Sequence, residues 1–308
     1  MSFRTIKVFW LYAGLFCLFG FMRYHQLGSR PLSMEESSHA SAFLNLVKTH
    51  RHLYSPPNSQ GPAFYYAQLP VLWANAIFRW GWRPQMTDGA LRFGVATTGL
   101  LVLAGLLLAA NRIGKWGALA AFILAGLSGN LVFYSRYFLP EIYVALFTLG
   151  IYLGMTYYLD TKKPGYLIAA VISGFLLLST RGAFTIIGGI FVLAYFAPAY
   201  IRDFIEDMPG VHIYKTAQAL SSPGWFRALG LGGLIGGALC VLLFSSFFLN
   251  PRGLIDAVKG FALWDVLAAA PLPPRDYAYF FSDILARHEF VPLVLALVGV
   301  IFALILEE

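Results

Sequence analysis

The chain has 308 residues, of which 58% are hydrophobic and only 12% are charged. Soluble globular domains carry about 25% charged residues, so this composition excludes an ordinary soluble domain. Apolar runs of about 17 to 25 residues recur along the chain, and they lack the residue-by-residue alternation of a transmembrane barrel. The sequence therefore predicts an all-α polytopic membrane protein.

The formal net charge of +7 comes mostly from basic residues in short segments between apolar runs. That placement indicates membrane topology and contact with lipid headgroups rather than binding to nucleic acid. The only cysteines, Cys17 and Cys240, lie inside apolar runs. Their positions give neither a disulfide framework nor the spacing of a metal site.

Eight membrane spans are predicted. The first follows a basic start like that of a signal peptide, but no small-residue cleavage site comes after it, so we interpret it as a retained helix. The spans are expected at 6–26, 90–110, 116–135, 141–159, 164–180, 183–200, 226–249 and 289–306.

The first loop, 27–88, is expected to hold two helices at the membrane surface. Ser33 and Glu36 have the spacing of a capping box, which predicts a helix that starts near Met34. Residues 61–82 are long enough to span a bilayer, but their polar residues and five Tyr and Trp residues favour an interfacial helix. An apolar stripe in the first of these helices recurs at helical spacing over Ala40, Phe43, Leu44 and Val47.

Loop charges decide between eight and nine spans. With 61–82 in the interface, every short cytoplasmic segment is basic, as the positive-inside rule requires, and both termini are cytoplasmic. The basic residues of these segments are Arg4, Lys7, Arg112, Lys115, Lys162, Lys163, Arg202, Lys215 and Arg227. The loop 27–88, the turns 135–141 and 179–182 and the loop 250–288 then share the non-cytoplasmic face.

The order of these segments resembles the GT-C membrane glycosyltransferases, in the branch of the protein O-mannosyltransferases and lipid A aminoarabinose transferases. Within that branch it is most similar to the flippase activity-associated proteins. The stretches that carry the resemblance are "EESSHASAFLNL", "QGPAFYYAQLPVLW", "VFYSRYFLPEIYVALFTL", "LLLSTRGAF" and "SSFFLNPRGLIDAV". The resemblance covers nearly the whole chain and implies one GT-C-like domain over 1–308, without the C-terminal soluble domain of relatives.

The resemblance implies transfer of a sugar, with inversion, from a polyprenyl-phosphate donor to an acceptor at the non-cytoplasmic face. It assigns Glu35 as the general base and Glu141 as a second acid that orients acceptor or metal. A divalent metal ion is the one cofactor that it suggests, with Glu35 and His39 as candidate ligands. The expected partners are the lipid-linked sugar and membrane lipids. The substrate-binding candidates are Glu36, His39, Arg136 and Arg181, the last of these for the lipid phosphate.

All of these assignments except that of Arg181 have a structural alternative. Glu35 and Glu36 could interact with the helix dipole, with Glu36 as the capping partner, and Glu141 could be a first-turn acid in the same way. His39 could be a surface histidine, and Arg136 could extend along its helix to reach the interface.

Departures from the group support a rival function. Leu139-Pro140 and Gly182 stand where the group has polar residues. They favour a degenerate, non-catalytic GT-C relative that acts as a structural subunit among other membrane subunits. A transporter is disfavoured, because no predicted span carries an acid in mid-helix.

Overall fold

The computed structural model describes residues 3–54, 61–78, 86–180, 184–205, 211–220 and 224–268, together with 294, 295 and 298. Among these residues every regular element is a helix, which confirms the predicted all-α class. The helices are, in chain order, α1 (Phe3–Tyr24), α2 (Met34–Thr49), α3 (Pro62–Phe78), α4 (Asp88–Leu108), α5 (Ala110–Leu127), α6 (Gly129–Tyr134), α7 (Glu141–Thr161), α8 (Pro164–Leu178), α9 (Phe184–Ile205), α10 (Val211–Leu220), α11 (Trp225–Phe244) and α12 (Arg252–Ala268).

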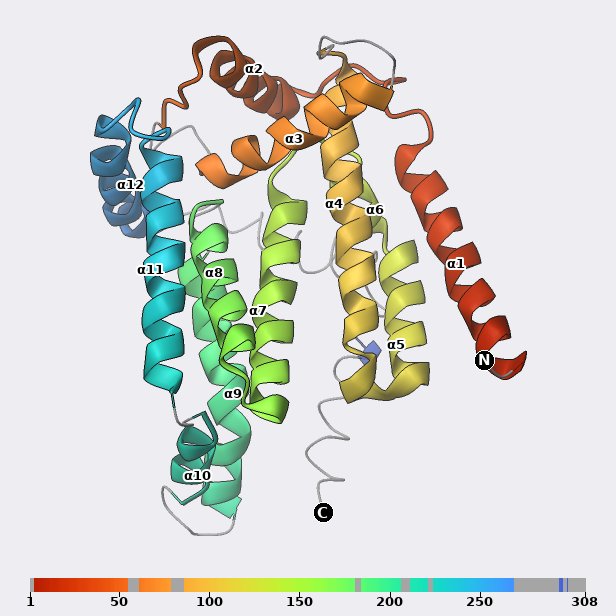
Figure 1. Cartoon of the computed structure of the whole chain (residues 1–308), viewed down its shortest axis with the longest axis vertical. Helices are drawn as coiled ribbons and strands as arrows, with labels where there is room; N and C mark the ends of the chain where they lie inside the picture. The colour runs from red at the N-terminus through yellow and green to blue at the C-terminus, as the bar shows by residue number, and fades with distance from the viewer. Residues whose placement is uncertain are drawn as a thin grey trace.

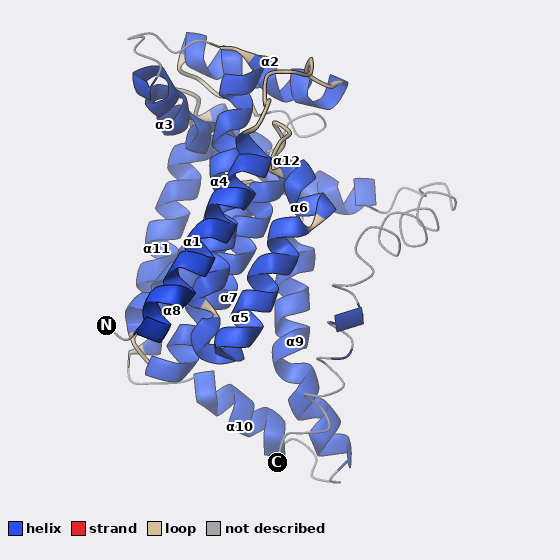
Figure 2. Ribbon diagram, turned by 90° about the vertical axis from the view of Figure 1, so that its right-hand side faces the viewer, coloured by secondary structure: helices blue, strands red, loops and turns tan. Residues whose placement is uncertain are grey.

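Seven helices, α1, α4, α5, α7, α8, α9 and α11, run roughly along the long axis of the molecule, and α2 and α3 lie across one end of them (Figure 1). The view turned by 90° shows α2 and α3 at the same end and α10 at the opposite one (Figure 2). We call the first the cap end; it also holds residues 25–33, 135–140, 179–180 and 245–251. The other is the hairpin end, with residues 109–115 and 161–164 and the start of α11.

Three of these helices, α4, α7 and α11, are long and apolar enough to cross a membrane. Shorter apolar helices cover 114–127, 164–178 and 187–201. These features are those of a helical membrane protein, while the number of spans and their orientation stay predictions. The predicted span 289–306 lies almost entirely outside the described residues.

The predicted span 116–135 is two helices rather than one. The helical path stops at Ser128, whose backbone is extended at φ −54° and ψ 121°. The Ser128 hydroxyl accepts a hydrogen bond from the amide of Leu131 and so caps α6. Serine competes with the helix for backbone hydrogen bonds, which is why it ends the helix here.

Helix α2 begins as predicted, at Met34, and its capping box is present. The Ser33 hydroxyl accepts from the Glu36 amide at 3.3 Å, and the Glu36 carboxylate accepts from the Ser33 amide at 3.0 Å. On the buried face of α2, Phe43 packs on Phe138, with ring centroids 5.8 Å apart. Phe64 of α3 also packs on Phe138, with ring centroids 5.0 Å apart. The cap is therefore part of the packed core.

Hydrogen bonds join the cap to the ends of α8 and α11, through the backbone at α8 and through a serine hydroxyl at α11. The amide of Gly61 donates to the carbonyl of Thr180 at 2.9 Å, and a Cβ at Gly61 would lie only 2.0 Å from the Ser179 carbonyl oxygen. Beside α11, the Ser246 hydroxyl accepts from the amide of His52 at 2.9 Å and donates to the His52 carbonyl at 3.1 Å. Glycine is required at position 61, because any side chain would push α3 from α8.

Candidate functional site

Glu36 and Arg92 form a buried ion pair where α2 and α4 begin. The Arg92 Nε lies 2.8 Å from Glu36 Oε1, and Arg92 Nη2 lies 2.8 Å from Oε2. Both side chains are at most 1% exposed. This two-bond geometry is the strong form of the arginine–carboxylate contact.

Backbone groups complete the coordination of both partners. Glu36 also accepts from the amides of Ser33 and Phe138, the second at 2.8 Å. The Arg92 guanidinium donates to three carbonyl oxygens at 2.8–3.1 Å, those of Leu27, Arg30 and Pro31. All five guanidinium donors are therefore used, and each carboxylate oxygen accepts two hydrogen bonds. Glu36 thus has a structural role, as the capping alternative proposed.

The environment keeps Glu36 ionised. Burial alone would raise the pKa of the Glu36 carboxyl, but hydrogen bonds from Arg92, Ser33 and Phe138 and the Arg92 charge outweigh burial. The net result is a pKa below the usual value. A carboxylate held in this way is a poor general base, because its lone pairs are already occupied.

The pair brings together the segments that carry the two predicted catalytic acids. Glu35 precedes Glu36 in the first turn of α2, and its side chain is exposed at the cap end. Glu141 begins α7, three residues after Phe138, and is partly buried. Since Phe138 donates to Glu36, the turn before Glu141 is held against the start of α2.

His39 is buried, and its alternative interpretation as a surface histidine is wrong. Its side chain is 6% exposed, and Nδ1 lies 2.8 Å from the hydroxyl of Tyr65. His39 lies on the inner face of α2, three residues after Glu36 and four before Phe43. It shares the helical face of the predicted apolar stripe.

A second buried histidine, His52, was not found from the sequence. Its ring lies 4.7 Å from the ring of Tyr65 and is 2% exposed. Burial lowers the pKa of His52 to about 4 and raises the pKa of Tyr65. A histidine in a polar loop gives no sequence signal of burial, because its burial depends on α3 and on the end of α11.

Arg136 supports the fold at α1. Its guanidinium donates to the carbonyls of Met22 and His25, the second at 2.8 Å, at the C-terminal end of α1. In exchange, Arg23 of α1 donates to the carbonyls of Gly126 and Ala125 at the end of α5, at 3.3 and 3.5 Å. Cations at helix C-termini satisfy the last carbonyls, so this contact is structural.

Two of the predicted assignments are left without a structural outcome. Arg181 lies outside the described residues. Within the described part of the chain, no group of three His, Cys, Asp or Glu side chains could hold a metal ion. Arg92 is the residue of this cluster that the sequence analysis missed, and its contacts are structural. The available signal was its position, since an arginine two residues into a predicted span must find a partner.

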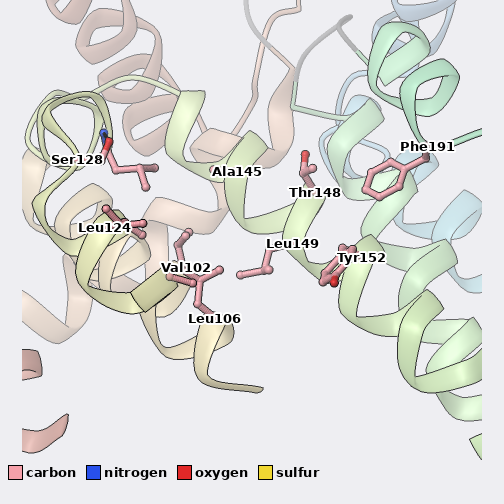
Figure 3. Close-up of a pocket in the computed structure, with 12 residues that line it drawn as sticks. Val102, Leu106, Leu124, Ser128, Ala145, Thr148, Leu149, Tyr152 and Phe191 are labelled. Atoms are coloured by element: carbon pink, nitrogen blue, oxygen red, sulfur yellow. Dashed lines mark hydrogen bonds between the residues drawn. The ribbon is translucent and has the colours of Figure 1, made fainter. Parts of the chain in front are cut away.

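An open apolar groove runs between the bundle helices below the cap. Its volume is about 610 Å³, and Figure 3 shows the side chains that line it. The α7 wall includes Ala145, Thr148, Leu149 and Tyr152, while Val102 and Leu124 face them from α4 and α5. Ala145 follows Glu141 by four residues, so the groove lies under the same face of α7 that carries Glu141 at its end.

No protein-family model, no curated protein and no solved structure matches this chain.

Proposed function

We propose that this chain is a GT-C-like glycosyltransferase that moves a sugar from a polyprenyl-phosphate donor to an acceptor hydroxyl at the cap end. One observation carries the proposal. The start of α2 is hydrogen-bonded to the turn before α7, and an apolar groove lies below this contact. A lipid-linked donor needs polar groups at a membrane surface and an apolar path for its chain, and these features supply both.

In the proposed reaction the acceptor oxygen bonds to the anomeric carbon while the bond to the phosphate oxygen breaks. Glu35 takes the acceptor proton, and the lipid phosphate leaves with the bonding electrons. Glu35 is the better base of the adjacent pair, because it is exposed while Glu36 is fully bonded. Glu141 orients the acceptor from the start of α7.

The leaving phosphate needs a cation to stabilise its charge. Arg92 and Arg136 donate their hydrogen bonds inside the fold, so other basic residues must bind the phosphate. Arg181 is the candidate from the resemblance. Arg30 adds an exposed cation at the cap end, where its guanidinium lies 4.4 Å from the centroid of the Tyr137 ring. The Arg30 Nη1 donates to the Tyr137 hydroxyl at 2.5 Å, so the other N–H groups of this guanidinium are the ones proposed to bind phosphate oxygens.

A second candidate function, the non-catalytic subunit, is favoured by a separate observation. Glu36 and Arg136, which the resemblance assigns to substrate, both use their hydrogen-bonding groups inside the fold. A relative that kept the architecture and lost the chemistry would retain such contacts. Both candidate functions are compatible with the packing of the cap, so a measurement of enzymatic activity must distinguish them.

The test is a transfer assay with the purified chain and a panel of polyprenyl-phosphate sugars. Glu35→Gln is expected to lower turnover by about 10²–10⁴-fold, the usual contribution of a general base. Asp160→Asn, an exposed acid at the hairpin end, is the matched control and should leave turnover unchanged. Turnover by Glu35→Gln equal to wild type would reject Glu35 as the base. A folded wild type that is inactive with every donor would favour the non-catalytic subunit.

A further inference from the structure

A second groove uses a different face of α7, that of Ile151, Met155 and Tyr158, and Phe191 of α9 lines both grooves. This second groove has a volume of about 600 Å³ and is enclosed by α7, α8, α9 and α11. The wall of α8 extends from Leu167 to Leu178, which is almost the whole helix. Nearly all lining side chains are apolar, so the groove suits a hydrocarbon chain.

The groove ends among aromatic and basic residues at the hairpin end. Tyr158, near the end of α7, and Trp225, the first residue of α11, both line it. The Nζ of Lys162 lies 5.6 Å from the centroid of the Tyr158 ring, which places this cation beside a residue that lines the groove. Lys163 follows at the N-cap of α8 and is exposed.

The tight turn between α7 and α8 determines this placement. Lys162 is left-handed at φ 55°, and its amide donates to the carbonyl of Tyr158 at 2.7 Å. Lys163 is the N-cap of α8 and gives no side-chain hydrogen bond to the first turn of the helix. The N-terminal end of the α8 dipole is positive, and it adds to the positive potential of both lysines. The exposed Asp160 leaves the turn with a net charge of +1.

We propose that this groove binds an anionic phospholipid, with its phosphate at Lys162 and Lys163 and an acyl chain along α8. Charge complementarity selects an anionic headgroup, because basic pockets between membrane helices attract such lipids. Tryptophan and tyrosine at the same level are typical of the headgroup region. This site lies at the opposite end from Glu35 and does not depend on the proposed glycosyl transfer.

The test is native mass spectrometry of the full chain in detergent with equimolar phosphatidylglycerol and phosphatidylcholine. Wild type is expected to retain one phosphatidylglycerol in preference to phosphatidylcholine. Each lysine near an anionic group contributes about fivefold in affinity, so Lys162→Gln/Lys163→Gln should weaken phosphatidylglycerol retention about 30-fold. Lys48→Gln/Lys259→Gln removes the same charge from exposed positions on α2 and α12 and should have no effect.

A second pair of variants tests the groove itself. A Cβ at Gly188 or at Gly189 would meet no atom within 4 Å, but only Gly188 lines the groove. Gly188→Phe should therefore block retention, while Gly189→Phe should preserve it. If Gly188→Phe does not fold, retention of phosphatidylglycerol by Gly188→Leu and by the lysine variants tests the proposal instead. Equal retention of both lipids by wild type, or equal effects within either matched pair, would overturn the proposal.

Discussion

Replacement of Arg92 by methionine is expected to loosen the cap while the bundle stays folded. The variant keeps an unbranched side chain of about the length of the arginine aliphatic part and removes all five donors. Glu36 then remains as a buried carboxylate with only the amides of Ser33 and Phe138 as donors. Three carbonyl oxygens also lose the donor that they share in the wild type.

Breaking a buried ion pair by removing one partner costs about 3–5 kcal/mol, because the remaining charge has no compensation. The three carbonyl oxygens that lose Arg92 add little to this cost, because water can hydrogen-bond to them once the cap loosens. The total loss of stability therefore stays at about 3–5 kcal/mol. For a chain of 308 residues the loss corresponds to a decrease of about 5–8 °C in Tm. Glu36→Met/Arg92→Met should be less destabilised than the sum of the two single variants by about 2 kcal/mol, since no lone charge is left.

Thermal unfolding in detergent micelles measures the loss, and hydrogen exchange of the α2 amides locates it. Glu35→Met is the matched control for Glu36→Met, because the two glutamates are adjacent and only Glu36 is buried. The exposed control should change the free energy of unfolding by less than about 0.5 kcal/mol. An Arg92→Met protein within about 1 kcal/mol of wild type, with α2 still protected from exchange, would refute the structural role of the pair.

Three further outcomes are expected. Stability should decrease by about 3 kcal/mol between pH 6.5 and pH 4, because buried His52 stays neutral in the folded state down to about pH 4 while the unfolded chain takes up a proton near pH 6.5. His52→Phe should flatten that part of the pH–stability curve measured by thermal unfolding, and an unchanged slope would exclude His52 as its cause. Gly61→Ala should cost about 1–3 kcal/mol in the same assay because of its 2.0 Å contact, whereas Gly165→Ala, with open space around it, should not. In a chain without native cysteines, single cysteines at Ser29 and at Lys162 should be labelled from opposite sides of the membrane; labelling from one side would contradict the eight-span topology.

Local sequence patterns predicted the local features of this fold. The start of α2 at Met34 follows from the Ser33–Glu36 spacing, which involves neighbouring residues only. The apolar runs predicted the helical class in the same way. The break at Ser128 was missed, because an apolar run hides a single capping serine when hydropathy is averaged over a whole span.

The contacts of the candidate site could not be predicted locally. Glu36 and Arg92 are 56 residues apart in the chain, and their pairing depends on how α2 lies on α4. The predicted apolar stripe of α2 included Ala40 and Phe43 but not His39, the residue just before Ala40. His39 could therefore be interpreted as a surface residue. The resemblance pointed to both acids at the start of α2, but Glu35 and Glu36 have different surroundings that only packing could distinguish.

The hydrogen bonds of Arg23 and Arg136 at the end of α1 have a consequence for how the chain folds during its synthesis. Arg23 donates to carbonyls near residue 126, and Arg136 donates to the carbonyl of Met22 across 114 residues of chain. A ribosome delivers α1 long before either contact can form. The end of α1 therefore cannot reach its final hydrogen-bonded state until α4, α5 and the turn after α6 have been synthesised. Insertion of the first helix and its docking are separate events, and the second must wait for Arg136.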